Sequence, residues 1–343
     1  MMLDSLRLLR SPVGHALGAS LLLACSSAPP GETSASDDEA LGLAPARFDV
    51  VSINDGTDAE CPWNYRDSDG QPRCVSSAEW RALNYASPHF VVMGSDDHEA
   101  DIEAAGNHLA LYFNDLNDGW GKGQSGAAAA DDAWSWANEH FSGSPPAWFV
   151  VNEVSRGGWE GESGDADGAR YRAYVVAFVT RLANDRQRKV ILCTPYVTPA
   201  SGSAGSKAAA QAASWRSVAK VAVLAAEVQM TGAAVAADPG LPERSLGKTI
   251  AAYAALGIDT HERLMIVDNF SNTKPGGEYG RAGASVAQWE TAIGARAKAF
   301  EALTGQLRGY LSYGWAGNEM GSTSATRVTF ETHYAAQKLP NGE

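Results

Sequence analysis

Three apolar stretches of this sequence end in a carboxylic acid, and acids in such places can do general acid–base chemistry. They are Glu153 after Trp148–Val151, Glu227 after Leu224–Ala226, and Asp268 after Met265–Val267. One carboxyl group can protonate a leaving oxygen while a second attacks the carbon or activates a water molecule. This is the chemistry that cleaves an acetal, for example a glycosidic bond.

Other polar and aromatic residues follow the apolar stretches and could bind a ligand rich in hydroxyl groups. Amide and carboxylate groups bond hydroxyls, and indole rings stack on the apolar faces of sugar rings. The residues predicted to bind substrate are Asn54, Asp96, Asn114, Asn152, Tyr196, Gln229, Trp120 and Trp315, and Trp159 also lies just beyond a strand end. An alternative role for the acids and amides is to cap the helices that follow.

The elements that must position these residues are short apolar runs typical of parallel strands covered on both faces. Eight such runs occur: Phe48–Ile53, His89–Met93, His108–Phe113, Ala147–Val151, Lys189–Thr194, Val221–Ala226, Arg263–Val267 and Gly309–Tyr313. Helices are predicted between them over 77–85, 99–105, 128–141, 168–184, 214–220, 246–256 and 285–303.

Strands that alternate with helices predict an α/β fold, and eight units are the number that closes a single (β/α)8 TIM barrel. The sequence therefore predicts one barrel domain over residues 46–343. A doubly wound open sheet is the alternative. That fold more often has a glycine-rich phosphate turn after its first strand, whereas this chain has Asn54-Asp55-Gly56 there.

With this strand order, the pair Asn152-Glu153 follows the fourth strand and Trp315 follows the eighth. The arrangement resembles the retaining (β/α)8 glycoside hydrolases of clan A. The resemblance implies that Glu153 is the general acid/base, that Asn152 binds the sugar 2-hydroxyl and that Trp315 stacks on a sugar. The resemblance extends over the whole barrel as far as the architecture is concerned. At the level of sequence motifs it is limited to these residues.

The second carboxylate departs from the clan pattern, which expects a glutamate at the end of the seventh strand. The seventh strand here offers Asp268, and the sixth offers Glu227. If the count of strands is off by one, Glu227 is the clan's nucleophile. Otherwise Asp268 takes the role, or Glu153 pairs with Glu227 in an enzyme outside the clan. We favour Glu227, because an aspartate at a strand end is readily explained as a helix cap.

The N-terminus predicts export. Residues 1–24 read as a signal peptide, and Leu22-Leu23-Ala24-Cys25 resembles the bacterial lipobox, which implies lipidation of Cys25. Residues 25–45 read as a flexible tether. The protein would then be anchored by lipid to a bacterial membrane, at the cell surface or in the periplasm, or be secreted. An ordinary signal peptide with an incidental cysteine is the alternative.

An exported chain can form disulfides, and we expect one between Cys61 and Cys74, which flank a loop. Cys193 lies inside an apolar run and is interpreted as a buried, inert thiol. No CxxC or HExxH motif occurs, so neither a metal nor a cofactor is expected. The run Asp96-Asp97-His98-Glu99 could bind a hard cation, but a helix cap is the preferred interpretation.

The charge composition argues against some classes of binding partner. The net charge is −13 and the isoelectric point about 5.0, so the chain is a poor candidate for binding nucleic acid or an anionic membrane surface. We expect a monomer that acts on a poly- or oligosaccharide and touches a membrane only through its lipid anchor. The alternatives are a non-catalytic glycan-binding lipoprotein on the same barrel and a barrel hydrolase of a non-sugar substrate.

Overall fold

The computed structural model describes the strands and helices of one compact unit of the chain, Leu43–Glu343. The described residues are 49–53, 63–66, 72–75, 90–93, 104, 108–113, 116–141, 145–195, 203, 205–228, 230, 232–269 and 286–313. The predicted signal peptide, Cys25, the tether and the predicted helix over 77–85 lie outside them, as does most of the predicted helix over 99–105.

Eight parallel strands lie side by side in one sheet. They are β1 (Asp49–Ile53), β4 (Phe90–Met93), β5 (His108–Phe113), β6 (Trp148–Val151), β7 (Lys189–Thr194), β8 (Ala222–Glu227), β9 (Leu264–Asn269) and β10 (Gly309–Tyr313). Strands adjacent in this order pair with one another, and β1 pairs with both β4 and β10, so the pairs close into a ring. The eight predicted strands are therefore confirmed.

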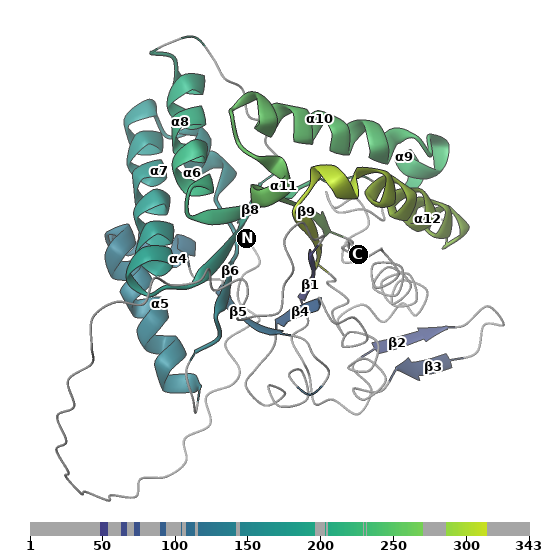
Figure 1. Ribbon diagram of the computed structural model, residues 1–343, viewed down its shortest axis with the longest axis horizontal. Helices are drawn as coiled ribbons and strands as arrows, with labels where there is room; N and C mark the ends of the chain where they lie inside the picture. Colours follow the sequence, from purple (N-terminus) through teal and green to yellow (C-terminus); the bar gives the residue numbers. More distant parts are fainter. Residues whose placement is uncertain are drawn as a thin grey trace, which may run out of the picture. The chain divides into compact units, whose positions relative to one another are not determined.

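Helices follow the strands from β5 to β9 and make the fold α/β (Figure 1). They are α4 (Leu116–Gly121), α5 (Gly126–His140), α6 (Arg156–Glu160), α7 (Asp165–Thr180) with the π-helical turn η2 (Arg181–Asp185), α8 (Lys207–Ala219), α9 (Gly232–Ala237), α10 (Leu241–Ala255), α11 (Thr260–Arg263) and α12 (Val286–Leu303) with the 3-10 turn η3 (Thr304–Gln306). Helix α8 begins earlier than predicted, at Lys207, because the Ser206 hydroxyl caps it by accepting the Ala209 N–H at 3.1 Å.

A two-stranded antiparallel sheet was not predicted. It consists of β2 (Trp63–Arg66) and β3 (Pro72–Val75), which pair from Trp63 opposite Val75 to Arg66 opposite Pro72. The expected partner of Cys74, Cys61, lies outside the described residues, so the disulfide stays a prediction.

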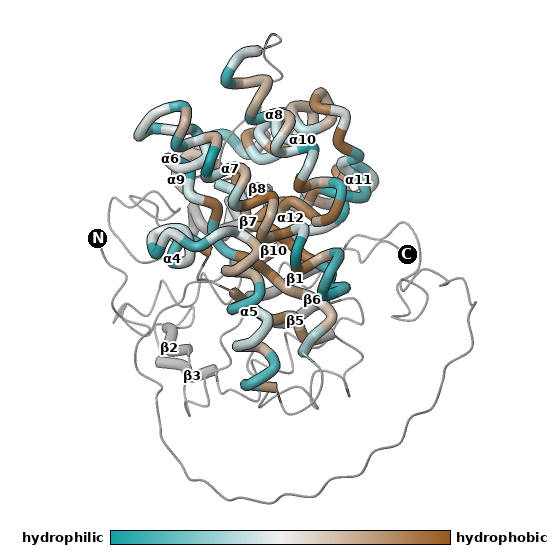
Figure 2. Tube along the Cα trace, turned by 90° about the vertical axis from the view of Figure 1, so that its left-hand side faces the viewer, coloured by the Kyte–Doolittle hydropathy of each residue, from teal (hydrophilic) through white to brown (hydrophobic). Residues whose placement is uncertain are grey.

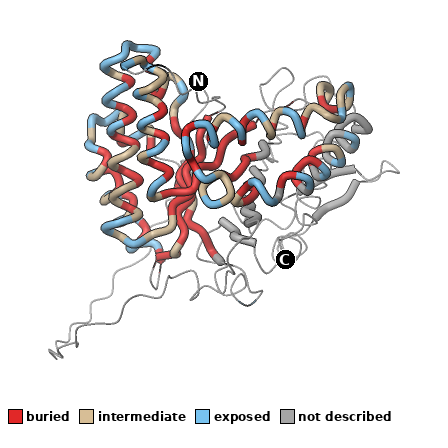
Figure 3. The backbone as a smooth tube through the Cα atoms, turned by 45° about the horizontal axis from the view of Figure 1, so that its top comes forward, coloured by how far each residue is buried: buried red, intermediate tan, exposed pale blue. Residues whose placement is uncertain are grey.

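Where burial is described, the strands from β5 to β10 are mostly buried on both faces, whereas α5, α7, α8 and α10 each have a buried and an exposed side (Figure 3). On one face Phe113 stacks on Phe178 of α7 with ring centroids 5.5 Å apart, and Tyr310 meets Phe300 of α12 at 4.5 Å. Because successive strand residues point to opposite faces, the alternate positions face the interior of the ring. Leu311 is one of these and is fully buried.

Helices α5 and α7 pack closely, which fixes the layer beside β5 and β6. A Cβ atom at Gly126 would lie 2.0 Å from the carbonyl oxygen of Tyr174, so only glycine fits there. The brown, apolar strands lie behind helices of mixed polarity in Figure 2. None of the helices in the described part of the chain is both long and apolar enough to span a bilayer.

The contact between α7 and β5 predicts a large loss of stability when it is truncated. Phe178 is fully buried, so Phe178→Ala should lower the free energy of unfolding by about 3–5 kcal/mol through lost burial and a cavity. Trp136→Ala is the control, because this side chain is 44% exposed, and we expect a loss of less than about 1 kcal/mol. Urea denaturation measures both, and equal losses would contradict this packing.

Candidate active site

Strand β6 brings Asn152 and Glu153 to the carboxyl end of the sheet, where active sites of parallel barrels are built. The Asn152 N–H donates to the Phe113 carbonyl at 2.9 Å and so extends the pairing of β6 with β5 by one residue. Asn152 is buried, and the peptide bond between it and Glu153 is cis. Glu153 itself is exposed, but the surrounding protein removes enough water to raise the pKa of its carboxyl group.

The backbone of the turn after Glu153 is held by hydrogen bonds on both sides. The Val154 N–H donates to the Cys193 carbonyl of β7 at 3.1 Å, and Asn117 Nδ2 of α4 donates to the Glu153 carbonyl at 2.7 Å. Ser155 then caps α6, since its hydroxyl accepts the Gly158 N–H at 3.1 Å. The backbone that carries Glu153 is therefore fixed to a strand and to two helices.

Glu227 is the last residue of β8, and it is 6% exposed. Leu224 and Ala226 of the same strand belong to the core shared with the helices. By strand alternation, Glu227 faces the interior of the ring. β8 is sixth in chain order among the ring strands, as counted from the sequence, so the possibility that this count was off by one is excluded.

Cys193 lies in the strand between the two that carry the glutamates. It lies in β7, which pairs with β6 on one side and β8 on the other, and it is 1% exposed. Burial raises the pKa of its thiol well above the usual value, and the negative charges of Glu227 and Glu153 raise it further. Glu153 follows β6 and Glu227 ends β8, so both glutamates come from the strands that flank β7, at the same carboxyl end of the sheet. The interpretation of Cys193 as a buried free thiol is confirmed.

The remaining predicted site residues divide into two groups. Asp268 lies in β9, the seventh ring strand, where its backbone is paired with Ser312. Outside the described residues lie Asn54, Asp96, Asn114, Tyr196, Gln229 and Trp315. The assigned roles of all seven stay predictions.

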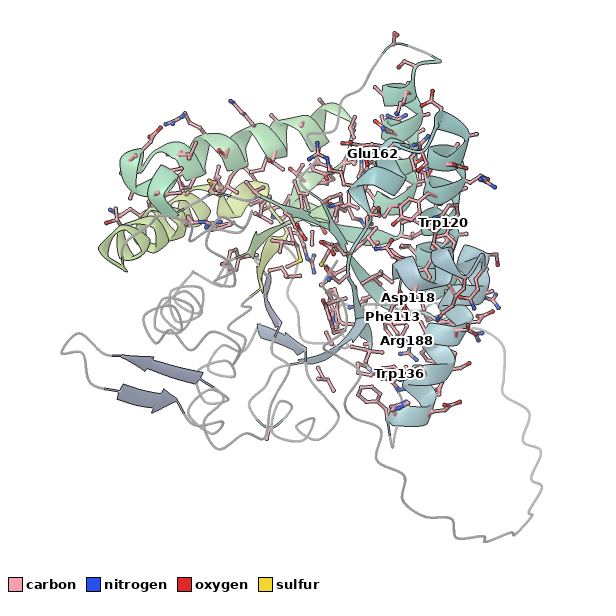
Figure 4. All side chains as sticks on the ribbon, turned by 180° about the vertical axis from the view of Figure 1, so that it is seen from behind. Phe113, Asp118, Trp120, Trp136, Glu162 and Arg188 are labelled. Carbon is pink, nitrogen blue, oxygen red and sulfur yellow. The ribbon has the colours of Figure 1, made fainter. Side chains whose placement is uncertain are left out.

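Two tryptophans beyond the strand ends take part in packing (Figure 4 labels Trp120). Trp120 is half-buried in α4 and meets the rings of Tyr171 and Tyr174 edge-on, with centroids 5.3 and 5.5 Å away. Its sugar-binding role stays a prediction. Trp159 is fully buried and stacks on Trp215 at 3.8 Å. Because α6 places the Trp159 ring against α8, this ring is not open to a ligand.

Three residues near the site were not recognised from the sequence. Asn117 and Tyr171 are hydrogen-bonded to each other, and Asn117 also bonds to the Glu153 carbonyl. Arg296 of α12 is buried and donates to the carbonyl of Val228, the residue after Glu227, at 3.4 Å. The only available signal was the apolar face of α7, to which Tyr171 belongs. In the described part of the chain, no three His, Cys, Asp or Glu side chains are grouped so that they could hold a metal ion.

Neither a protein-family model nor a curated protein sequence matches this chain. Among solved structures, a GH18 chitinase from Pseudoalteromonas aurantia aligns with a TM-score of 0.51 and 11% identity, over 83% of this chain and 99% of that chain. An endo-beta-N-acetylglucosaminidase mutant from Cordyceps militaris aligns with a TM-score of 0.48 and 10% identity, over 90% and 98% of the two chains. The likeness to the chitinase shows a shared fold.

The surroundings of Cys193 predict that its thiol is unreactive in the folded protein. A raised pKa leaves little thiolate near pH 8, and burial blocks access, so iodoacetamide should leave the Cys193 peptide unlabelled in the native state and label it in urea. Peptide mass mapping distinguishes this cysteine from the other three. Rapid labelling of Cys193 in the native state would contradict the described burial.

Proposed function

We propose that this protein is a glycoside hydrolase that cleaves a poly- or oligosaccharide with two carboxylates on a complete (β/α)8 barrel. The observation that carries the proposal is the placement of Glu153 and Glu227 at one end of the sheet, on either side of Cys193. Their surroundings differ: Glu153 is exposed, and Glu227 is buried facing the interior of the ring. Two carboxylates in unlike surroundings suit the two unlike roles that glycoside hydrolysis requires.

Glu153 is assigned as the general acid. Its raised pKa keeps the proton on the carboxyl group to higher pH than an ordinary glutamate would, and its exposure gives a substrate access to that proton. It protonates the glycosidic oxygen as the bond from that oxygen to the anomeric carbon breaks. The same group, now a carboxylate, takes a proton from the incoming water if the reaction proceeds through a covalent intermediate.

Glu227 is assigned as the second carboxylate, which either attacks the anomeric carbon or takes a proton from the attacking water. Asp268 is the substitute for this role. Asn152, buried beside Glu153, is assigned to hold a substrate hydroxyl. Trp315 is assigned as a sugar platform, as the resemblance to clan A implies.

The proposal includes the export and localisation predicted from the sequence. We propose a lipid anchor on Cys25, a disulfide between Cys61 and Cys74, and a monomer exposed at the cell surface or in the periplasm, or secreted. A complete barrel also requires helices after β1, β4 and β10. The ring of strand pairs supports this proposal, because a closed parallel sheet must be covered all around.

A non-catalytic glycan-binding protein is the second candidate. The observation that favours it is that the seventh ring strand carries Asp268 where the clan pattern expects glutamate. Such a protein would bind a glycan without turnover, and Glu153→Gln would leave its affinity nearly unchanged.

The proposed mechanism predicts that both glutamates are needed for turnover. On a panel of polysaccharides, Glu153→Gln and Glu227→Gln should each reduce the release of reducing ends at least about 100-fold, because each removes a proton-transfer or nucleophilic group. Each variant keeps the size of its side chain, and urea denaturation serves as the control for folding.

Other outcomes of this assay identify the alternatives. If only Glu153→Gln loses activity, and Asp268→Asn loses it as well, the second role belongs to Asp268. Binding without any release supports the glycan-binding candidate and contradicts the proposed hydrolysis.

The pH dependence of turnover should report the Glu153 carboxyl group. Desolvation raises its pKa above the ordinary 4.5, so the protonated acid persists above that pH. We expect kcat/KM to fall on the alkaline side at a pH higher than 4.5, as Glu153 loses its proton, and this limb should vanish in the residual activity of Glu153→Gln. A limb at or below 4.5 would remove Glu153 from the role of acid.

A further inference from the structure

The turn that carries Glu153 rests on a chain of hydrogen bonds whose centre is the Tyr171 hydroxyl. Tyr171 lies in α7 and is 1% exposed. Its oxygen accepts the Ser155 N–H at 2.7 Å, and its O–H donates to Asn117 Oδ1 at 2.6 Å. The other end of the same amide, Asn117 Nδ2, donates to the Glu153 carbonyl at 2.7 Å. One phenol thus ties both ends of the Glu153–Ser155 backbone to α4 and α7.

The directions of these hydrogen bonds are fixed by the chemistry of the groups. A backbone N–H can only donate, so the Tyr171 oxygen accepts from Ser155 and uses its single hydrogen towards Asn117. This sets the Asn117 amide with its oxygen towards Tyr171 and its NH₂ towards the Glu153 carbonyl. The phenol also stays neutral, because burial raises the pKa of Tyr171 beyond any working pH.

We propose that Tyr171 and Asn117 are positioning residues, which hold the Glu153 backbone so that its carboxyl group meets the glycosidic oxygen. The inference rests on the proposed function and adds the residues that orient its acid. Neither side chain needs to touch substrate. A shift of about 1 Å in a reacting group can cost about 100-fold in rate, so this anchoring has a measurable effect on turnover.

Helix α7 offers a matched control in Tyr174, three residues along the chain from Tyr171. Tyr174 is 5% exposed, its hydroxyl donates to the Leu116 carbonyl at 2.8 Å, and its ring meets the same Trp120 ring that Tyr171 meets. Each Tyr→Phe change removes one buried hydroxyl from the same helix. Only the Tyr171 hydroxyl is bonded to the turn after Glu153.

The test compares the full chain with three single variants, Tyr171→Phe, Tyr174→Phe and Asn117→Ala. It also includes the double variant that combines Tyr171→Phe with Asn117→Ala. We expect Tyr171→Phe to lower kcat by about 10- to 100-fold with little change in KM, and Tyr174→Phe to lower it less than about 3-fold, while both shift the urea midpoint similarly. Because Tyr171 and Asn117 act through one chain of hydrogen bonds, the double variant should be no slower than the slower single variant. Equal kcat for the two Tyr→Phe variants, or fully additive losses, would overturn the proposal.

A readout without substrate separates this inference from the proposed function. The Val154 N–H bonds to Cys193 and not to Tyr171, so its hydrogen exchange reports whether the turn has loosened. Its exchange should quicken about 10-fold in Tyr171→Phe and stay unchanged in Tyr174→Phe. Unchanged exchange in both variants would refute the anchoring. If the wild-type protein releases no sugar from any glycan, the proposed function fails together with the role in proton transfer, while the exchange result still decides whether Tyr171 holds the turn.

Discussion

Burial of the sheet on both faces is the constraint on which the rest of the structure depends. A strand covered by helices on one side and by the interior of the ring on the other can carry few polar side chains along its length. In β6 all four residues are apolar and buried, and the first polar group, Asn152, comes directly after the strand. β8 behaves alike, with apolar residues from Ala222 to Ala226 before Glu227. In these two strands the polar side chains therefore come at the carboxyl end.

The same constraint explains why the two glutamates differ. Glu227 still belongs to its strand, so its side chain is enclosed by the neighbouring strands. Glu153 has left its strand and is exposed, yet its pKa is raised because the turn lies close against the protein. Cys193, between β6 and β8, experiences the charge of both. One geometric rule thus yields an accessible acid and an enclosed carboxylate at one end of the sheet.

Strands could be predicted well from the sequence because burial on both faces leaves continuous apolar runs, which local composition reveals. The hairpin of β2 and β3 was missed because Trp63–Arg66 alternates aromatic and polar residues over a run too short to stand out. The short helices α4 and α6 were missed because they too are short, with 6 and 5 residues. Because α6 was missed, the burial of Trp159 was missed as well.

Only those residues of the candidate site that lie at strand ends could be predicted from the sequence. Glu153 and Glu227 follow from apolar runs, but the contact of Tyr171 with Asn117 joins residues 54 positions apart, which no local pattern reveals. The choice between Glu227 and Asp268 depends on how two strands of a closed ring face one another. Residue spacing contains no such information, although the strand order now establishes that Glu227 is on the sixth ring strand and Asp268 on the seventh.

The central claim is that Glu153 is an acid whose proton is retained by its place in the fold. A carbon-13 NMR titration of the glutamate carboxyl groups, assigned by comparison with Glu153→Gln, tests this without any substrate. We expect a pKa for Glu153 above 4.5 in the folded protein and a return to that ordinary value in urea. A folded-state pKa at or below 4.5 would contradict it, because the fold would then not favour the protonated form of the Glu153 carboxyl group.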